Sequence, residues 1–514
     1  MSTVQETERK YEGRPGRALP GLAGLPRVAA TSGPQEQVLR ADYYDTDDLR
    51  LIRNGITLRR RRGGSDAGWQ LKLPLGGDTR REIRRPPGRA GQPVPEELAR
   101  LVRVYTRGRE LHPVAKINTR RQVLTLVDAA GDSLAEIAAD DISAETLGAA
   151  TEISQWNEVE VELTGGDRGL LRDADTWLRR DGLRPSARTA KLARALAGPL
   201  VERERRATAN GHRDQPPAGS AGAVVLDYLR QQVARLQALD PLVRDDEPDS
   251  VHQMRVTARR LRSTLQSFGQ VIPRARTTEL IAGLKWLGVV LGEARDAEVL
   301  ASRLDRNLRA TPPEQVLGPV LARVQGHFAP VHAATRKAAL AALDSERYFA
   351  LLDALDELLD SPPLTAAAAR PAGHTLPAEA RHAYRRTARR MRRAQRAQRA
   401  HPGQDADVAY HEARKAAKRA RYAGEAVSPA LGKQARRFTK QMKQVQTVLG
   451  DHQDAVVARG VDRQLGVSAH LAGENAFSYG LLYERETERA DRLKKKANAA
   501  WAHRSRPHFR RWAS

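Results

Sequence analysis

The sequence predicts an α+β protein of two domains: an N-terminal domain of antiparallel strands and a C-terminal all-α domain that contains one half-domain twice. From about residue 4 to residue 197, short segments of alternating polar and apolar residues are separated by glycine and proline, which is typical of strands. From about residue 223, long leucine-, alanine- and arginine-rich stretches have helical spacing. The chain has 514 residues, enough for at least two domains.

The same patterns give the expected domain bounds. We place the strand domain at residues 1–200, a polar linker rich in glycine and proline at 201–222, and the helical domain at 223–510. The two helical repeats are expected at about 223–380 and 381–510.

The composition indicates an acidic ligand. The net charge of +25 attracts polyanions and makes their binding dependent on salt. Nucleic acid fits the charge, but only 4% of the residues are aromatic, and bases in an open groove stack on aromatic side chains. The absence of cysteine excludes disulfides and thiolate metal sites. With no apolar run of about 18 residues and no secretion signal, we expect a cytoplasmic protein without a membrane partner. The oligomeric state stays open.

Charged side chains share one face in several predicted strands, because alternate residues of a strand point the same way. The charged faces carry Glu6, Glu8 and Lys10; Arg59 and Arg61; Arg80, Glu82 and Arg84; Lys116 and Arg120; and Glu158, Glu160 and Glu162. The opposite faces carry Leu58, Leu71, Ile83, Ile117, Val159, Val161 and Leu163. We expect the apolar faces to pack outward against helices and the charged faces to line a closed barrel. Any one of these faces is also typical of a solvated strand with surface ion pairs, but the repeated bias favours the barrel.

A lumen of mixed charge needs a ligand that balances it. Carboxylates bind hard divalent cations through oxygen, while lysine and arginine bind phosphate oxygens. The charged faces therefore predict a site for a metal ion together with phosphate.

These strands resemble the CYTH domain, also called the triphosphate tunnel metalloenzyme domain. Residues 6–10 (ETERK) match its E-x-E-x-K signature. Further matching segments follow in the family's order: 43–46, 58–61, 71–72, 80–82, 135–140, 158–163 and 189–191. The resemblance implies an eight-stranded antiparallel tunnel with flanking helices, which hydrolyses the terminal phosphate of a triphosphate with Mg²⁺ or Mn²⁺.

The resemblance also implies site residues. The expected metal-binding and catalytic residues are Glu6, Glu8, Asp140, Glu158, Glu160 and Glu162. The expected triphosphate-binding residues are Lys10, Arg59, Arg61, Lys72, Arg80, Glu82, Lys116, Arg120 and Lys191. The sequence leaves open which glutamate contacts the metal and which group orients the attacking water. A shift of one residue in register would exchange Arg120 for Arg121.

The helical half repeats a basic stripe. Residues 252–262 (HQMRVTARRLR) return as 411–421 (HEARKAAKRAR), and a Leu-Gly pair followed by aspartate at 291–296 returns at 449–454. On a helix, the offsets 0, 3, 7 and 10 fall within an arc of about 80°. One such stripe is typical of a solvated helix face, whereas two matched copies favour a binding surface.

This repeat resembles the CHAD domain, a conserved histidine α-helical domain. The resemblance implies two pseudo-symmetric four-helix bundles around a basic groove that binds inorganic polyphosphate. The expected contacts are His252, Arg255, Arg259, Arg262, Lys285, His411, Arg414, Lys418, Arg421 and Lys443. Lys418 stands where the first repeat has Arg259, which keeps the charge but loses the bidentate fork.

The two resemblances together predict an inorganic triphosphatase joined to a module that binds inorganic polyphosphate, with a possible place on polyphosphate granules. Two alternatives stay open at this point. The tunnel would act on thiamine triphosphate, an RNA 5′-triphosphate or ATP in a cyclase reaction, or the whole chain would bind polyphosphate without catalysis.

Overall fold

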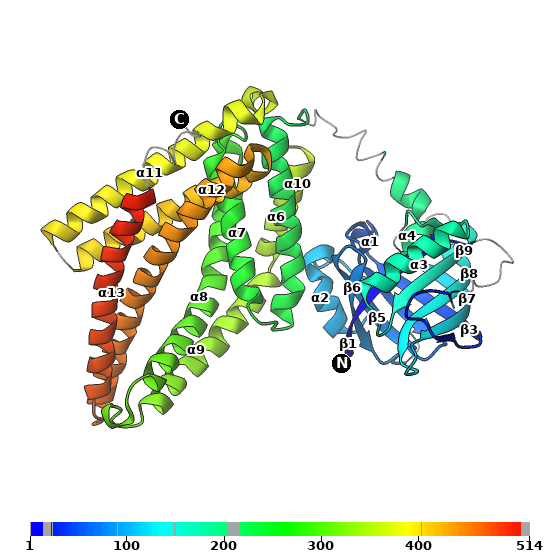
Figure 1. The fold of residues 1–514 in the computed structure, drawn as a ribbon, viewed down its shortest axis with the longest axis horizontal. Helices are drawn as coiled ribbons and strands as arrows, with labels where there is room; N and C mark the ends of the chain where they lie inside the picture. The colour runs from blue at the N-terminus through cyan, green and yellow to red at the C-terminus, as the bar shows by residue number, and fades with distance from the viewer. Residues whose placement is uncertain are drawn as a thin grey trace. The chain divides into compact units, whose positions relative to one another are not determined.

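A computed structural model describes residues 2–13, 22, 24–89, 91–148, 151–188, 190–202, 205, 216–401 and 403–504. The chain divides into two compact units, Met1–Asn210 and Gly211–Ser514, and each is described by itself (Figure 1). Most of the expected linker and Thr189 of the predicted 189–191 motif lie outside the described residues. The last two residues of the expected linker, 221 and 222, belong to the first helix of the second unit.

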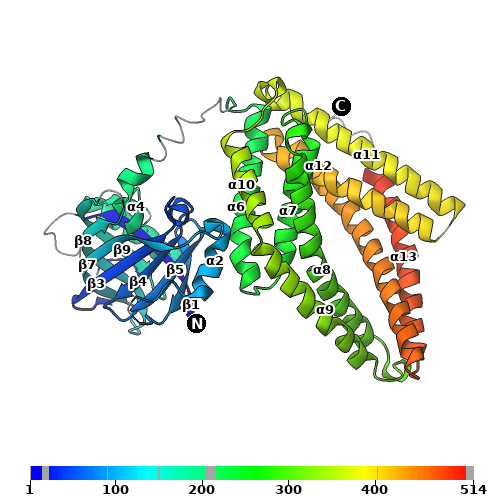
Figure 2. The same cartoon turned by 180° about the vertical axis from the view of Figure 1, so that it is seen from behind.

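The described part of the first unit contains a closed antiparallel barrel of eight strands, which confirms the predicted fold (Figure 2). Around the barrel the strands follow the order β1, β6, β5, β4, β3, β7, β8 and β9, and β9 pairs with β1 to close it. Their bounds are β1 Ser2–Glu12, β3 Gln35–Asp45, β4 Thr57–Arg62, β5 Gly68–Gly76, β6 Thr79–Arg85, β7 His112–Val127, β8 Ser133–Thr146 and β9 Ile153–Leu163. Two short strands add to it: β2 (Ala30–Thr31) pairs with β7, and β10 (Arg184–Pro185) pairs with β1.

Four of the described helices pack against the strands of this barrel. They are α1 (Arg50–Arg53), α2 (Glu96–Thr106), α3 (Arg168–Arg180) and α4 (Lys191–Ala195). The apolar face of α3 packs on the outward side chains of β8 and β9, including Val159 and Val161, in one buried cluster. Outward packing of the apolar face is thus as predicted for β9, and its glutamates point into the barrel.

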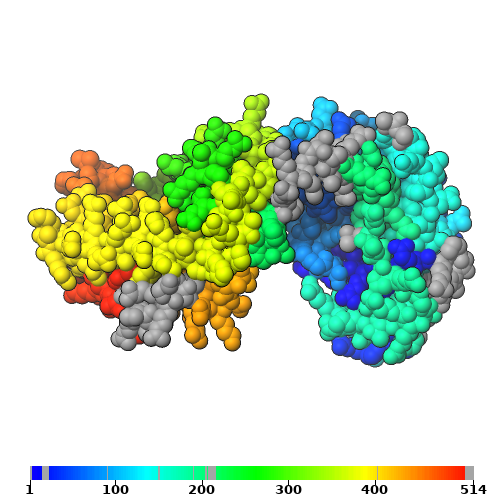
Figure 3. All heavy atoms as spheres, turned by 90° about the horizontal axis from the view of Figure 1, so that it is seen from above, coloured from blue at the N-terminus to red at the C-terminus, as the bar shows by residue number. Residues whose placement is uncertain are grey.

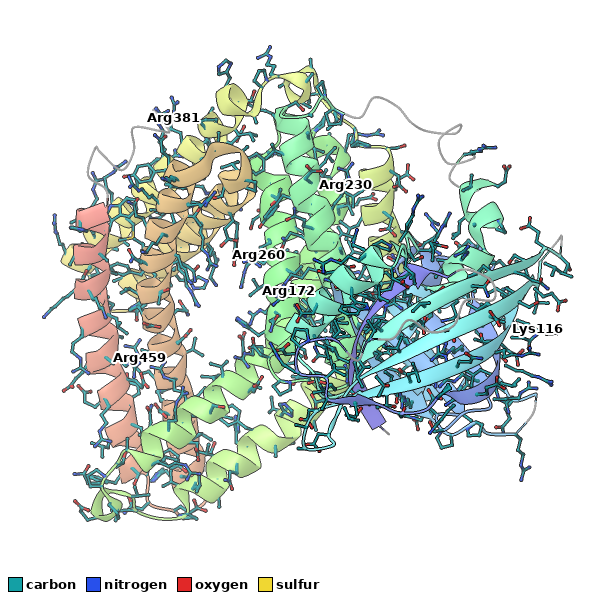
Figure 4. All side chains as sticks on the ribbon, turned by 45° about the vertical axis from the view of Figure 1, so that its right-hand side comes forward. Lys116, Arg172, Arg230, Arg260, Arg381 and Arg459 are labelled. Atoms are coloured by element: carbon teal, nitrogen blue, oxygen red, sulfur yellow. The ribbon has the colours of Figure 1, made fainter. Side chains whose placement is uncertain are left out.

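The two faces of β7 are the reverse of the prediction. Lys116 and Arg120 are exposed, whereas Ile117 is buried and packs with Leu192 of α4. Figure 4 shows Lys116 on the outer side of the barrel. The physical reason is that α4 lies against the inward faces of β3, β7 and β8, so the apolar residues of β7 turn inward to meet it. The predictions that Lys116 and Arg120 line the barrel and that Ile117 points outward are therefore wrong.

The described part of the second unit is helical, and its helix order repeats. The helices are α6 Ala221–Arg244, α7 Ser250–Ser267, α8 Thr278–Arg309, α9 Val320–Leu343, α10 Glu346–Asp360, α11 Ala372–Ala400, α12 Gln404–Leu471 and α13 Phe477–Arg504. Three short 3₁₀ turns join them: η1 Arg274–Arg276, η2 Pro313–Gln315 and η3 Ala366–Ala369. In Figure 3, α11 (yellow) covers much of one face of this unit.

The helix α12 is two helices joined at Gly432, whose φ of 64° suits glycine. With α12 divided there, α6 to α9 correspond in order to α11, the two halves of α12, and α13. Each repeat therefore supplies four matching helices, as the predicted duplication requires, and α10 of the first repeat has no counterpart among the described helices. None of the described helices combines the length and the apolar character that a membrane span needs.

Candidate active site and basic cavity

Strand β1 presents Glu6, Glu8 and Lys10 to the inside of the barrel. Its register places these residues next to charged residues of the two neighbouring strands. Glu6 pairs in register with Arg80 of β6, and Glu8 pairs with Glu162 of β9. Glu6 and Glu8 are 6% and 8% exposed. Burial of this kind requires partners of opposite charge or a bound cation.

Three carboxylates gather at one place on the inner wall. Glu6, Glu8 and Glu162 each offer an oxygen, and these oxygens lie within 4.8 Å of one another. Burial, then Glu6 and Glu8, raises the pKa of Glu162 to about 8, although Lys72 acts against them. The like charges therefore repel one another in the protein without a ligand.

This acidic triad, Glu6, Glu8 and Glu162, fits a divalent cation. Glu6 is held by Lys72, whose Nζ lies 2.5 Å from Oε2. Glu8 has Lys10 Nζ 3.2 Å from Oε2, while its buried Oε1 accepts no hydrogen bond from the described residues and has Arg80 3.4 Å away. In an octahedral Mg²⁺ site, ligand oxygens about 2.1 Å from the ion lie roughly 3 to 4 Å apart. The triad is therefore within a small movement of such a site.

The other acidic residues of the prediction are already held by cations. Glu160 contacts Lys10, Lys191 and Arg121, and Arg121 also makes two hydrogen bonds of 2.7 Å to Asp140. Burial would raise the pKa of Glu160, but Lys10, Lys191 and Arg121 hold it well below its usual range.

Asp140 and Glu158, the acids beside Glu160, pair with the same cations. Lys191 Nζ lies 2.9 Å from Asp140, and Lys10 and Lys191 each lie 3.6 Å from Glu158. Glu158 also accepts a hydrogen bond of 3.4 Å from Trp156 Nε1. Asp140, Glu158 and Glu160 thus position the inner cations, and the triad is the better metal site.

Cations from β4, β5 and β6 complete the lumen. Lys72 lies between Glu6 and Glu82, with Nζ 3.6 Å from the Glu82 carboxylate. Arg59 donates to Gln70 Oε1 at 2.6 Å and to the Tyr43 hydroxyl at 3.1 Å. Burial, then Arg59 and Arg121, lowers the pKa of Arg61 to about 9, although Arg61 contacts Asp66. Such crowding of like charges would be relieved by an anion.

The structure brings most of the predicted barrel residues together, and one predicted residue is replaced by its neighbour in the chain. Arg121 points inward and makes the contacts with Asp140 and Glu160, so it takes the place predicted for Arg120. The two neutral partners of Arg59, Gln70 and Tyr43, are not among the site residues predicted from the sequence. Gln70 lies two residues before Lys72 on β5, and strand alternation alone would have placed it on the charged face.

The second unit contains a basic cavity of about 550 Å³, lined by both copies of the basic stripe. The lining includes His252, Arg255, Arg259, Arg295, Asp296, Arg303, His411, Arg414, Lys418, Arg421, Tyr422, Gln446, Gln453 and Asp454. Seven of the predicted contacts are therefore in one place.

The repeated Leu-Gly and aspartate motif has a structural role in this cavity. Arg255 donates to Asp296 at 2.6 Å, and in the second repeat Arg414 lies 3.7 Å from Asp454. A Cβ atom at Gly292 would lie 3.1 Å from the guanidinium of Arg255, so glycine gives this side chain room.

Three predicted contacts do not line the cavity. Lys285 and Lys443 are exposed on α8 and α12. Lys285 lies about 15 Å along the helix axis from Arg295, the nearest lining residue of α8, whereas Lys443 lies about one helical turn from the lining residue Gln446. Arg262 is half-buried beside Arg259. Arg295 is not among the predicted contacts, yet it lines the cavity.

The cavity carries an excess of positive charge. Burial, followed by Arg259, Arg414 and Arg255, lowers the pKa of Lys418 to about 6. Burial also lowers the pKa values of His252 and His411. The cavity therefore contains bases that would take up protons when an anion binds.

Known proteins match both units. A model of the CYTH domain matches residues 5–188, and a model of the CHAD domain matches residues 227–461. Two uncharacterized proteins of Mycobacterium tuberculosis, one from each of two strains, are 38% identical to this chain over 511 residues, which cover 96% of this chain and 95% of each relative.

Solved structures resemble part of the chain. PptA from Streptomyces chartreusis is 21% identical with a TM-score of 0.47, and the match covers 55% of this chain and 99% of PptA. The CHAD domain from the plant Ricinus communis is 27% identical with a TM-score of 0.44, and the match covers 56% of this chain and 96% of that domain.

The raised pKa of Glu162 predicts a pH dependence of stability. The folded protein keeps a proton that the unfolded chain releases near pH 4.5, so the free energy of unfolding should fall as pH rises from about 5 to 8. Glu162→Gln should remove most of this fall, and Mg²⁺ should remove it in the wild type by favouring the ionised form. This pH dependence is measured by unfolding the protein in urea at several pH values in the presence of a chelator, with hydrogen exchange of the β1 and β9 amides as the readout. An unchanged pH dependence in Glu162→Gln would contradict the assignment.

Proposed function

Because this chain belongs to the family of proteins that join a CYTH domain to a CHAD domain, we propose that it hydrolyses inorganic triphosphate in its barrel and binds inorganic polyphosphate in its helical cavity. The observation that carries the first part is the acidic triad facing lysines and arginines within one closed lumen. A surface that only binds polyanions gains nothing from three carboxylates at its centre. Their presence supports catalysis with a cation.

In this proposal, the triad holds Mg²⁺ or Mn²⁺ and the cations hold the phosphates. Lys72 and Arg80, now paired with Glu6 and Glu8, are placed to exchange those carboxylates for phosphate oxygens when the ion binds. Arg59 and Arg61 extend the positive wall. The bound ion would neutralise negative charge that develops on the transferred phosphoryl group.

The inner cluster of Lys10, Lys191 and Arg121 would hold the far end of the triphosphate. Their pKa values are raised: burial alone would lower them, but Glu160 and its acidic neighbours more than offset that effect. These three side chains therefore stay charged over the whole physiological range, and they remain anchored by Asp140 and Glu160 while they bind phosphate.

The cavity supports the second part of the proposal. It gathers cations from both repeats, and among the described residues its aspartates, Asp296 and Asp454, each pair with one arginine. Few aromatic side chains line it, so a phosphate chain without bases matches it better than single-stranded nucleic acid.

The barrel proposal is tested by phosphate release from tripolyphosphate, ATP, thiamine triphosphate and long-chain polyphosphate with Mg²⁺ or Mn²⁺. We expect tripolyphosphate to be the best substrate. Glu6→Gln/Glu8→Gln should reduce kcat/KM by at least about 100-fold, because the ion loses two charged ligands. Arg121→Gln should also reduce it, whereas Arg120→Gln, on the outer face, should not. Absence of metal-dependent release from every substrate would overturn this part.

The cavity proposal is tested by equilibrium binding of long-chain polyphosphate with DNA as competitor. Arg255→Glu and Arg414→Glu should each weaken polyphosphate binding by about tenfold or more, because each replaces a phosphate contact by a repulsive charge. The wild type should retain polyphosphate when DNA is added at equal phosphate concentration. Displacement by DNA would show a general polyanion binder.

The lowered pKa of Lys418 predicts proton uptake on binding. A bound polyanion favours charged Lys418, so above about pH 6 the protein should take up close to one proton, and affinity should fall as pH rises. Calorimetry in two buffers of different ionisation enthalpy measures this uptake. The arginine of Lys418→Arg is already charged before the anion binds. This variant should therefore take up fewer protons on binding, and the difference is the number of protons that Lys418 takes up in the wild type. Equal uptake by both proteins would contradict the role of Lys418.

A further inference from the structure

The same contact between the two repeats occurs twice in the helical unit, once with a carboxylate and once with an amide. Arg260 Nε of α7 donates to Glu425 Oε2 of α12 at 3.0 Å, and Arg419 of α12 donates to Gln266 Oε1 of α7 at 2.7 Å. In the sequence repeat, Arg419 is the counterpart of Arg260, and Gln266 is the counterpart of Glu425. The pseudo-two-fold symmetry therefore holds for the geometry and is broken for the charge.

On the Glu425 side, the carboxylate offsets part of the charge of its neighbours. Glu425 Oε1 also accepts a hydrogen bond of 2.7 Å from Arg421, so one carboxylate serves both Arg260 and Arg421. The counterparts on the other side are Arg419 and Arg262, and the neutral Gln266 leaves the charge of both uncompensated.

Two further arginines join the Gln266 side. Arg274 of η1 donates to the backbone oxygen of Gln266 at 2.9 Å, and Arg386 of α11 lies near Arg419. We call Arg262, Arg274, Arg386 and Arg419 the arginine cluster. Within the described part of the chain, no member of the cluster forms an ion pair with a carboxylate. Glu379 is the acid that Arg274 influences, and it is half-buried with a pKa that burial raises.

The cluster is electrostatically strained. Burial, then Arg386, Arg262 and Arg274, lowers the pKa of Arg419 to about 10. Like charges brought together in a partly buried place cost free energy, and an anion bound among them would offset that cost.

The cluster is continuous with the basic cavity. Arg262 lies about one helical turn beyond Arg259, which lines the cavity, and Arg259 contributes to lowering the pKa of Arg262. An anion that is longer than the cavity therefore meets uncompensated arginines on this side, and on the other side it meets arginines whose charge Glu425 partly offsets.

We propose that the arginine cluster is a second phosphate-binding subsite, which receives the part of a polyphosphate chain that extends beyond the cavity. The chain leaves the cavity on the Gln266 side because that side lacks the carboxylate present at Glu425. This inference rests on the proposed polyphosphate binding by the cavity. It assigns to the cluster the selection of long chains over short ones.

The test uses the chain's own asymmetry. Gln266→Glu places in the cluster the carboxylate that the other side already has, and Glu425→Gln removes that carboxylate from the other side. Binding of long-chain polyphosphate, tripolyphosphate and orthophosphate is measured on the full-length protein over a range of salt concentrations. The barrel is identical in all variants, so differences between them report on the helical unit.

We expect Gln266→Glu to weaken long-chain binding by about tenfold and to reduce its salt dependence by about one phosphate contact, with tripolyphosphate binding unchanged. Glu425→Gln should strengthen long-chain binding. Gln266→Ala, which removes the hydrogen bond without adding charge, should change long-chain affinity by less than about threefold, and this separates charge from a structural role.

Three results would overturn the subsite. Long-chain affinity unchanged in Gln266→Glu would remove the cluster from the binding surface. An equal loss for tripolyphosphate and long chains would place the effect in the cavity. A loss confined to orthophosphate would show a site for the free ion. If the wild type binds no polyphosphate at all, the proposed function of the cavity fails instead, and that outcome is distinct from these three.

Discussion

A closed barrel with charged side chains inside is stable only when each buried charge has a partner of opposite sign. The lumen of this protein meets that condition in two layers. An inner layer pairs Lys10, Lys191 and Arg121 with Glu160 and its acidic neighbours, and it is balanced without a ligand. The layer around the acidic triad is less well balanced, since three carboxylates crowd together there and burial, with the neighbouring Glu6, raises the pKa of Glu162. The division into a balanced layer and an unbalanced one is what makes the barrel a site for a ligand.

The helical unit also has an unbalanced charge, but here the excess is positive. Its cavity collects more cations than its two aspartates neutralise, and the imbalance appears as the lowered pKa of Lys418. Duplication of the half-domain explains how two basic stripes line one cavity, because each repeat supplies half of the lining. Divergence between the repeats, as at Gln266 and Glu425, then gives a nearly symmetric cavity two different sides.

Both units bind phosphate in the proposal, but their means differ. The barrel has three carboxylates that would hold a metal ion beside the phosphates, and such an ion neutralises charge in phosphoryl transfer. The cavity has no comparable cluster of three acidic ligands among the described residues, and it is suited to holding a chain. Joining the two in one chain would raise the local concentration of phosphate near the barrel.

The sequence by itself determined the two-domain fold, the charged inner faces of most strands, and the duplicated basic stripe, because these depend on local periodicity and on repetition. It left the role of each glutamate open, since Glu158, Glu160 and Glu162 share one strand face and differ only in what stands opposite them. Pairing with β1 and the approach of Lys191 decided that Glu162 joins the triad and Glu160 joins the cations. The tertiary structure also decided the orientation of β7, because the helix that its apolar residues meet lies far along the chain. Local patterns fix which residues share a face, whereas packing against distant elements fixes which way that face points.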